Sequence, residues 1–194
     1  QLINMARVAV IPFYIVPIFG FQAAGFLERA WYFSAAPLSI ILAIQKKAMF
    51  PYISRIQERT DKIRRFTEDS IYVSALVDKL MFLPLLLFAR EIVLIVFGEQ
   101  WLPMLPLLYW VLAGNILFGA LAGSLYPVAN GIGRANLVSR FNLIGLMLSW
   151  VLIVPLTLLF GLVGVGMAGM IMWGAVHWLK TKVADEVGEF AYYV

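Results

Sequence analysis

The feature that most constrains the fold is a charge-free run of 39 residues, 141–179. About 20 apolar residues cross the hydrocarbon core of a bilayer once as a helix, so this run is long enough for two crossings. Of the 194 residues, 62% are hydrophobic and only 13% are charged, which is too apolar for an ordinary soluble domain. The sequence therefore predicts an integral membrane protein.

Charges and helix breakers divide the chain into about six apolar spans, and runs of this length favour helices over barrel strands. We expect an all-α, polytopic membrane helix bundle that forms a single transmembrane domain over residues 1–194. A short apolar piece, 92–97, is too short to cross and is expected to be a helix end or a re-entrant segment. Turns are expected at Gly20/Gly25 and around Gly161, and the small residues at 164–169 are expected to permit close helix approach. The expected spans are 8–24, 26–50, 71–89, 101–126, 141–160 and 163–179.

A basic segment lies between the second and third spans. Residues 46–65 contain seven of the fifteen Lys/Arg residues, and 51–70 is expected to be a cytoplasmic, amphipathic loop. Twelve Lys/Arg residues fall on the side of both termini, against only Arg29 and Arg90 on the other, so the positive-inside rule places both termini in the cytoplasm. The segment is either an orientation signal alone or a contact for anionic phospholipid and an anionic lipid-linked substrate. The candidate headgroup contacts are Lys46, Lys47, Arg55, Arg59, Arg64 and Arg65.

Two neighbouring charges, Asp78 and Lys79, lie inside the third span. A charge at a helix centre costs about 2.5–3.5 kcal/mol, so such residues either line a polar cavity or pair with another helix. Sequence neighbours point about 100° apart on a helix, so each needs its own partner. We take both as candidates for a substrate cavity. The further cavity candidates are Arg29 and Glu28, otherwise interfacial anchors, and Asn115, otherwise a hydrogen bond between helices.

The chain contains no cysteine and one histidine, His177. A disulfide framework, the usual zinc sites and a Cys/His catalytic pair are therefore excluded, and a Ser/His/Asp triad would have to use His177. The glycines at Gly131 and Gly133 lack the spacing of a dinucleotide site. We expect no catalytic residue, no metal site, no nucleic-acid partner and no cofactor other than a coupling ion, Na⁺ or H⁺.

Several short motifs occur at set positions relative to the spans. They are GFLERA at 25–30, FPYISR at 50–55, LP at 83–84, FGEQWLP at 97–103, NGIGR at 130–134 and FGLVGVGMA at 160–168. In this order the chain resembles the oligosaccharide flippases of the polysaccharide biosynthesis/export family, within the superfamily of multidrug and toxin extruders and the lipid II flippase. A Tyr-Tyr pair is common in that family after the first glycine, and Phe26-Leu27 stands here instead.

The resemblance implies the C-terminal half of a two-bundle transporter that flips undecaprenyl-pyrophosphate-linked oligosaccharide across the bacterial inner membrane by alternating access. The cargo would be an O-antigen, capsule or exopolysaccharide repeat unit, and no covalent chemistry is implied. The implied partners are this lipid-linked oligosaccharide and either the N-terminal half of the same transporter or a second copy. The chain starts at Gln1 without a signal peptide, and we expect a fragment of a longer protein.

Two other functions stay open at this point. A cation-coupled multidrug extruder of the same superfamily would use Asp78 to bind Na⁺ or H⁺. An integral membrane glycan polymerase or transferase would place catalytic residues in substantial loops, and the outer loops expected here are short.

Overall fold

The computed structural model describes residues 9, 11–55, 60–131 and 135–187, and these are almost entirely helical. The described part holds six α-helices and no strand, which confirms the all-α prediction. In chain order the elements are the π-helix η1 (Ile11–Ile15), α2 (Val16–Arg55), α3 (Thr60–Leu87), α4 (Ala89–Val96), the 3-10 helix η2 (Glu99–Met104), α5 (Leu105–Gly131), α6 (Ala135–Phe160) and α7 (Val163–Val187).

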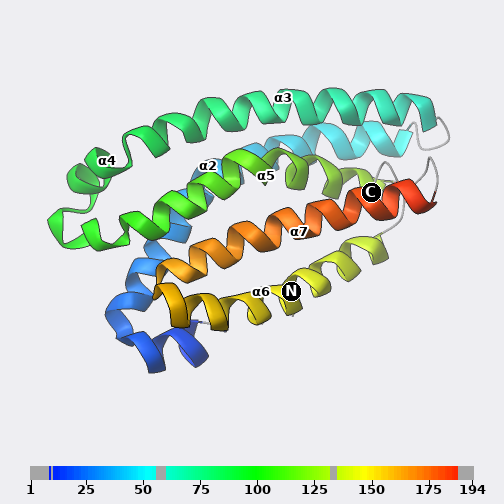
Figure 1. Ribbon diagram of the computed structural model, residues 1–194. Coiled ribbons are helices and arrows are strands. Elements are labelled where there is room, and N and C mark those ends of the chain that lie inside the picture. The colour runs from blue at the N-terminus through cyan, green and yellow to red at the C-terminus, as the bar shows by residue number, and fades with distance from the viewer. Residues whose placement is uncertain (1–8, 10, 56–59, 132–134, 188–194) are drawn as a thin grey trace.

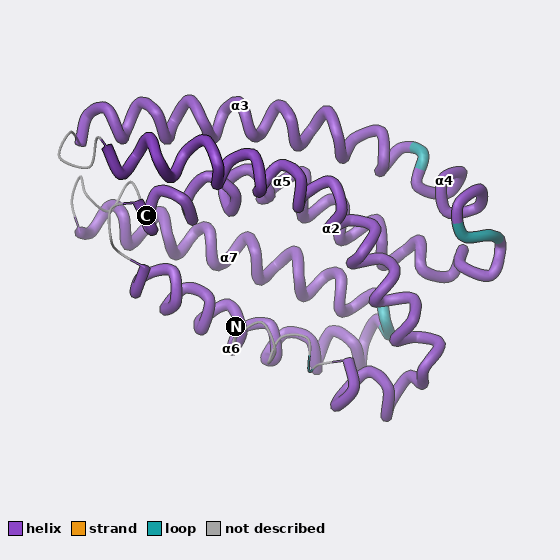
Figure 2. Tube along the Cα trace, turned by 180° about the vertical axis from the view of Figure 1, so that it is seen from behind, coloured by secondary structure: helices purple, strands orange, loops and turns teal. Residues whose placement is uncertain are grey.

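The long helices lie side by side as an elongated bundle (Figure 1). Helix α5 packs along α2, α3 and α7, and α6 packs along α7. The end of α2, the start of α3 and the end of α7 lie at one end of the bundle, while α4 lies at the other (Figure 1). Figure 2 shows from behind that the loops of the described part are short and gather at the α4 end. Consecutive long helices therefore run up and down the bundle.

The core is built around α5. Its side chains Leu107, Leu108 and Leu112 are fully buried, as is Phe82 of α3. On α3 the buried positions Ser74, Asp78 and Phe82 recur every four residues, which places them in one stripe that faces the bundle. The remaining buried members of the core are Ile15, Ala24, Leu27, Ala30, Ala89, Val93, Met104, Ile153, Val165 and Ala168.

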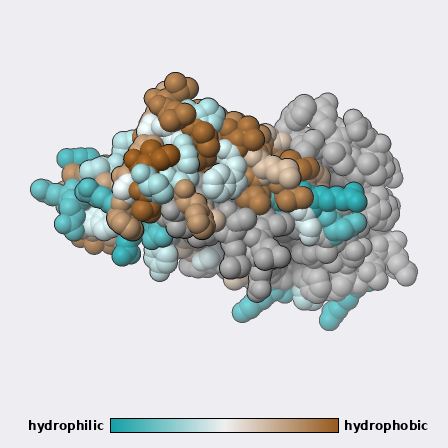
Figure 3. Space-filling view, turned by 90° about the horizontal axis from the view of Figure 1, so that it is seen from below, coloured by the Kyte–Doolittle hydropathy of each residue, from teal (hydrophilic) through white to brown (hydrophobic). Residues whose placement is uncertain are grey.

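Large apolar side chains also cover the outside of the bundle. Leu80 of α3 is 77% exposed and Leu158 of α6 is 72% exposed, and soluble monomers rarely expose continuous apolar patches of this kind. The face in Figure 3 carries many hydrophobic side chains in its middle, with hydrophilic ones gathered at its left end. Within the described residues, two stretches are long and apolar enough to cross a membrane, Glu99–Gly119 and Ser139–Phe160, and Val163–His177 is apolar but shorter.

The N-terminal region differs from the prediction of two spans, 8–24 and 26–50. The element α2, Val16–Arg55, joins two helical segments across a kink at Gly20, where φ is 82° and ψ is 173°, so the break lies at Gly20 and not between residues 24 and 26. That conformation is open to glycine and strained for other residues, so the turn predicted at Gly20 is real, whereas Gly25 lies within the helix. The hydroxyls of Tyr14 in η1 and Thr157 in α6 lie 2.7 Å apart, which ties the short segment before the bend to α6.

The structure also corrects the prediction of a loop at 51–70. Residues 51–55 continue α2 and residues 60–70 form the first turns of α3, so the basic segment extends two helices beyond their apolar parts. The ring of Tyr52 lies 4.4 Å from the ring of Phe66, and this contact holds the two extensions together. Phe66 of this segment therefore contacts the neighbouring helix. The piece 92–97 forms the end of the short helix α4 and its C-cap Phe97, which agrees with the helix end predicted there.

Small residues let α7 approach its neighbours closely, as the sequence predicted for the glycines after Gly161. The turn itself uses Gly161, whose φ is +61°. A methyl group at Gly164 would overlap the backbone of Leu156 in α6, and one at Gly166 would lie 2.9 Å from the Cβ of Trp110 in α5. Only glycine fits at these two positions without a shift of the helices.

We expect Gly166→Ala to destabilise the protein by about 1–3 kcal/mol, the usual cost of an extra carbon in a packed interior. Gly169→Ala is the matched control on the same helix, because its methyl group would meet no atom within 4 Å. Thermal unfolding of the two purified variants compares them directly. Equal melting temperatures would contradict the close approach of α7 to α5.

Candidate functional site

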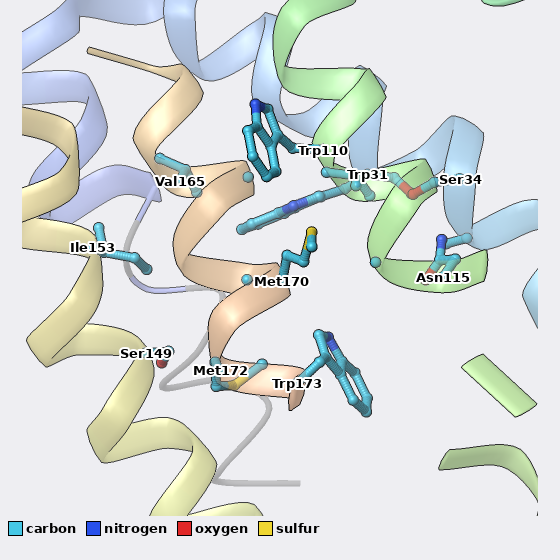
Figure 4. A pocket seen from close by; sticks show the side chains of 15 residues that line it. Trp31, Ser34, Trp110, Asn115, Ser149, Ile153, Val165, Met170, Met172 and Trp173 are labelled. Atoms are coloured by element: carbon cyan, nitrogen blue, oxygen red, sulfur yellow. The ribbon is translucent and has the colours of Figure 1, made fainter. Parts of the chain in front are cut away.

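A cavity of about 380 Å³ lies among α2, α5, α6 and α7. This volume falls within the range of about 300–1,000 Å³ that is typical of small-ligand pockets. Figure 4 shows the side chains of Trp31, Trp110 and Trp173 around this space, with Met170 between them. The lining residues are Trp31, Ser34, Ala35, Trp110, Val111, Gly114, Asn115, Ser149, Ile153, Val165, Gly166, Gly169, Met170, Met172 and Trp173.

Three uncharged polar side chains line the cavity. Ser34 donates its hydroxyl hydrogen to the carbonyl of Trp31 at 3.0 Å, and Ser149 donates to the carbonyl of Leu146 at 2.7 Å. Their oxygens are left as acceptors. Asn115, which the sequence suggested for the cavity, is among the lining residues. The described lining contains no Lys, Arg, Asp or Glu, so the cavity is an uncharged, aromatic pocket.

Asp78 is buried in the bundle but does not line this cavity. Its residue is 1% exposed, and both carboxylate oxygens lack a hydrogen-bond partner among the described residues. One turn earlier on the same stripe, Ser74 donates to the carbonyl of Ser70 at 2.6 Å. Burying an ionised carboxylate without a partner in an apolar surrounding costs free energy. Asp78 is therefore a candidate for a functional residue.

Lys79 lies about 100° around α3 from Asp78, outside the buried stripe. It is exposed, and the apolar residues Tyr72, Leu76, Leu80 and Leu83 on the same outer face are exposed as well. Asp78 and Lys79 therefore face different environments, as their spacing predicted, and neither lines the cavity.

Glu28 and Arg29 are exposed near the α4 end of the bundle. The guanidinium carbon of Arg29 lies 5.6 Å from the ring centre of Trp101, a distance typical of a cation–π contact. Trp101 in turn meets the edge of Phe26 at 5.8 Å and lies 6.1 Å from Phe97. This aromatic cluster holds Arg29 away from the cavity and fits the anchoring role left open by the sequence.

The headgroup-contact candidates lie at the other end of the bundle. Lys47 and Arg55 of α2 and Arg65 of α3 are exposed. Lys46 and Arg64 belong to α2 and α3, but their side chains lie outside the described part, and Arg59 falls wholly outside the described residues. The structure brings the ends of both helices together, and contact with lipid stays a prediction.

His177 is buried on α7 and stacks between two aromatic rings. Its ring centre lies 5.8 Å from those of Phe118 and Trp173. Trp173 also lines the cavity, so His177 packs against a residue of the cavity lining. Across the described residues, no group of three or more His, Cys, Asp or Glu side chains could hold a metal ion.

The cavity tryptophans were not singled out from the sequence. A signal was present, because Trp31 and Ser34 are three residues apart, and Met170 and Trp173 share the same spacing, so each pair shares a helix face. Which faces meet depends on the rotation of the packed helices.

Comparison with known proteins gives two matches. Residues 1–106 match the family described as "Polysaccharide biosynthesis protein". An "Uncharacterized membrane protein in cps region" of Klebsiella pneumoniae is 28% identical over 142 residues, which are 70% of this chain and 28% of that protein. The chain thus spans less than a third of the length of this relative. No solved structure matches the chain.

Replacing Asp78 by leucine tests whether its carboxylate is unpaired. We expect Asp78→Leu to raise the unfolding free energy by about 1–3 kcal/mol, because an apolar group of similar size removes an unsatisfied buried polar one. Asp69→Leu, at an exposed position of the same helix, is the control and should change it by less than about 0.5 kcal/mol. A lower melting temperature for Asp78→Leu would show that a bound ion or another group stabilises the carboxylate.

Proposed function

The chain belongs to the polysaccharide biosynthesis protein family, and from this premise we propose that it forms one helical bundle of a transporter for lipid-linked oligosaccharide. The cargo is an undecaprenyl-pyrophosphate-linked repeat unit, which the transporter moves across the bacterial inner membrane by alternating access. The protein performs no covalent chemistry in this account. The family match carries the proposal, and the match to a membrane protein in a cps region agrees with it.

The exposed face of α3 that carries Lys79 is an argument for a second bundle beside this one. Lys79 is exposed among apolar side chains, roughly 12 Å along the helix from the start of its apolar part at residue 71. In lipid, a charge at that depth costs about 2.5–3.5 kcal/mol. We therefore place this face of α3 against a polar cavity that another part of the transporter, or a second copy, closes.

The ends of the bundle support an orientation. Arg55, Lys62, Arg65 and Arg140 are exposed at the end of the bundle where α3 begins, and Arg90 lies on α4 at the other. By the positive-inside rule the first of these ends is cytoplasmic. In this account about six spans cross the membrane, and the exposed apolar side chains of α6 face lipid.

One observation favours a second candidate, a cation-coupled drug extruder. The carboxylate of Asp78 is buried without a partner among the described residues, and a buried carboxylate inside a membrane is a common binding group for a coupling cation. Dye efflux by the full-length protein that is lost in Asp78→Asn, in cells where glycan export is unaffected, would favour this candidate over the oligosaccharide transporter.

The transport proposal predicts that the full-length protein restores surface glycan in a strain that lacks its own flippase. Lys79→Ala should lower this export by about tenfold or more, since the loss of a charged contact of about 1.4 kcal/mol changes an equilibrium tenfold. Lys79→Arg should retain most of the export because it keeps the charge. Surface glycan is measured with a glycan-specific antibody on intact cells.

Lys62→Ala serves as the control for this series, since Lys62 is an exposed lysine of the same helix at the basic end of the bundle. It should leave export within about twofold of the parent. Normal export by Lys79→Ala would remove Lys79 from the transport pathway. Failure of the parent protein to restore export would contradict the proposed function itself.

A further inference from the structure

We infer that the uncharged cavity among α2, α5, α6 and α7 is a binding site for a neutral sugar ring of the cargo, and that it excludes the pyrophosphate and the polyprenyl chain. This inference rests on the proposed function, because it assumes that a lipid-linked glycan is the cargo. It assigns two parts of the cargo to different places in the transporter. The sugar is held inside this bundle, and the charged link of the cargo stays outside it.

The charge of the lining excludes pyrophosphate. None of the fifteen lining residues is Lys, Arg or His, and none is acidic. A pyrophosphate that enters such a pocket loses water and gains no counter-charge, which is costly. The exposed cations Lys79 and Arg29 lie outside the lining. The anionic part of the cargo therefore has to stay in another part of the transporter.

The polar lining favours a ligand that donates hydrogen bonds. The hydroxyl hydrogens of Ser34 and Ser149 are already used by backbone carbonyls one turn away, so each oxygen offers only acceptor sites. Asn115 lines the cavity and offers both a carbonyl and an amino group. Sugar hydroxyls both donate and accept. A fully ionised phosphate cannot donate, and a polyprenyl chain can do neither.

The aromatic lining suits the apolar C–H face of a sugar ring. Trp31, Trp110 and Trp173 surround the cavity (Figure 4), and an indole combines a broad apolar face with one N–H donor. The C–H face of a pyranose packs on such a surface while its hydroxyls point to the polar groups. A polyprenyl chain would also contact the indoles, but it would leave Ser34, Asn115 and Ser149 without partners, which costs free energy.

Glycines keep the space open. A methyl group at Gly169 would meet no atom within 4 Å, although three residues earlier Gly166 is pressed against Trp110 and Leu107. The absence of a side chain at 169 contributes room for a ligand and is not needed for helix packing.

The experiment uses photo-methionine, the diazirine analogue of methionine, in place of methionine in cells that make both the full-length transporter and its glycan. Met170 and Met172 line the cavity, so after illumination their peptides should carry an adduct that retains saccharide when mild acid cleaves the sugar–phosphate bond. Met147 is 61% exposed on the outside of α6 and is the internal control. Its peptide should carry phospholipid.

Three results would overturn the inference once the Met147 peptide shows that labelling worked. These are an adduct at Met170 or Met172 that keeps the prenyl chain after acid, no adduct at either residue, and the same adduct in cells that cannot make the glycan. Each of these leaves the transport proposal intact as long as export depends on the transporter. Loss of that dependence would instead contradict the transport proposal.

A matched pair of glycine substitutions gives a second readout. Gly169→Leu places a side chain in the cavity and should lower glycan export by about tenfold or more, because the pocket cannot hold both the side chain and the ligand. Gly25→Leu adds the same side chain to α2, at a helical glycine that also has no atom within 4 Å of a new methyl group and does not line the cavity. It should leave export within about twofold. Equal export by the two folded variants would contradict a ligand in this cavity.

Discussion

The packing of α7 against α5 is the contact on which the rest of the described structure depends. Helix α5 is enclosed by α2, α3 and α7, and α7 packs tightly on it at Gly166, where an added methyl group would lie 2.9 Å from the Cβ of Trp110. This contact fixes the separation of the two helices. It also fixes the width of the cavity, because Gly169 and Gly114 face the space that opens beside it. The close packing of the two helices therefore depends on Gly166, whereas Gly169 contributes open space to the cavity.

Polarity is sorted along the bundle rather than from inside to outside. Exposed Lys and Arg side chains lie toward the ends, while exposed Leu, Val and Met side chains cover the middle of α6. An apolar solvent produces this arrangement, because charges have to reach water at the two surfaces. Asp78 and Lys79 are the exceptions in the middle of α3. The side chain of Asp78 is buried in the bundle and that of Lys79 is exposed. The two residues therefore need separate functional explanations.

The sequence predicted the helical class, the short helix near residue 92, the turn at Gly161 and the close packing of the small residues after it. These follow from local composition, since a charge-free run has to be helical in lipid and glycines permit close approach. It failed at 51–70, where a charged stretch was interpreted as a loop although both halves continue neighbouring helices. The cavity could not be predicted from Trp31, Trp110 and Trp173, because their meeting depends on how three helices rotate against one another.

The central claim is that α3 crosses the membrane with its basic start in the cytoplasm. The chain contains no cysteine, so single cysteines can be introduced at Arg65 near the start of α3 and at Arg90 on α4, both of which are exposed. Labelling with a membrane-impermeant maleimide on spheroplasts measures which side each position faces. The account predicts that Arg90→Cys is labelled on intact spheroplasts and that Arg65→Cys is labelled only after the membrane is opened. Labelling of both positions from the same side would contradict it.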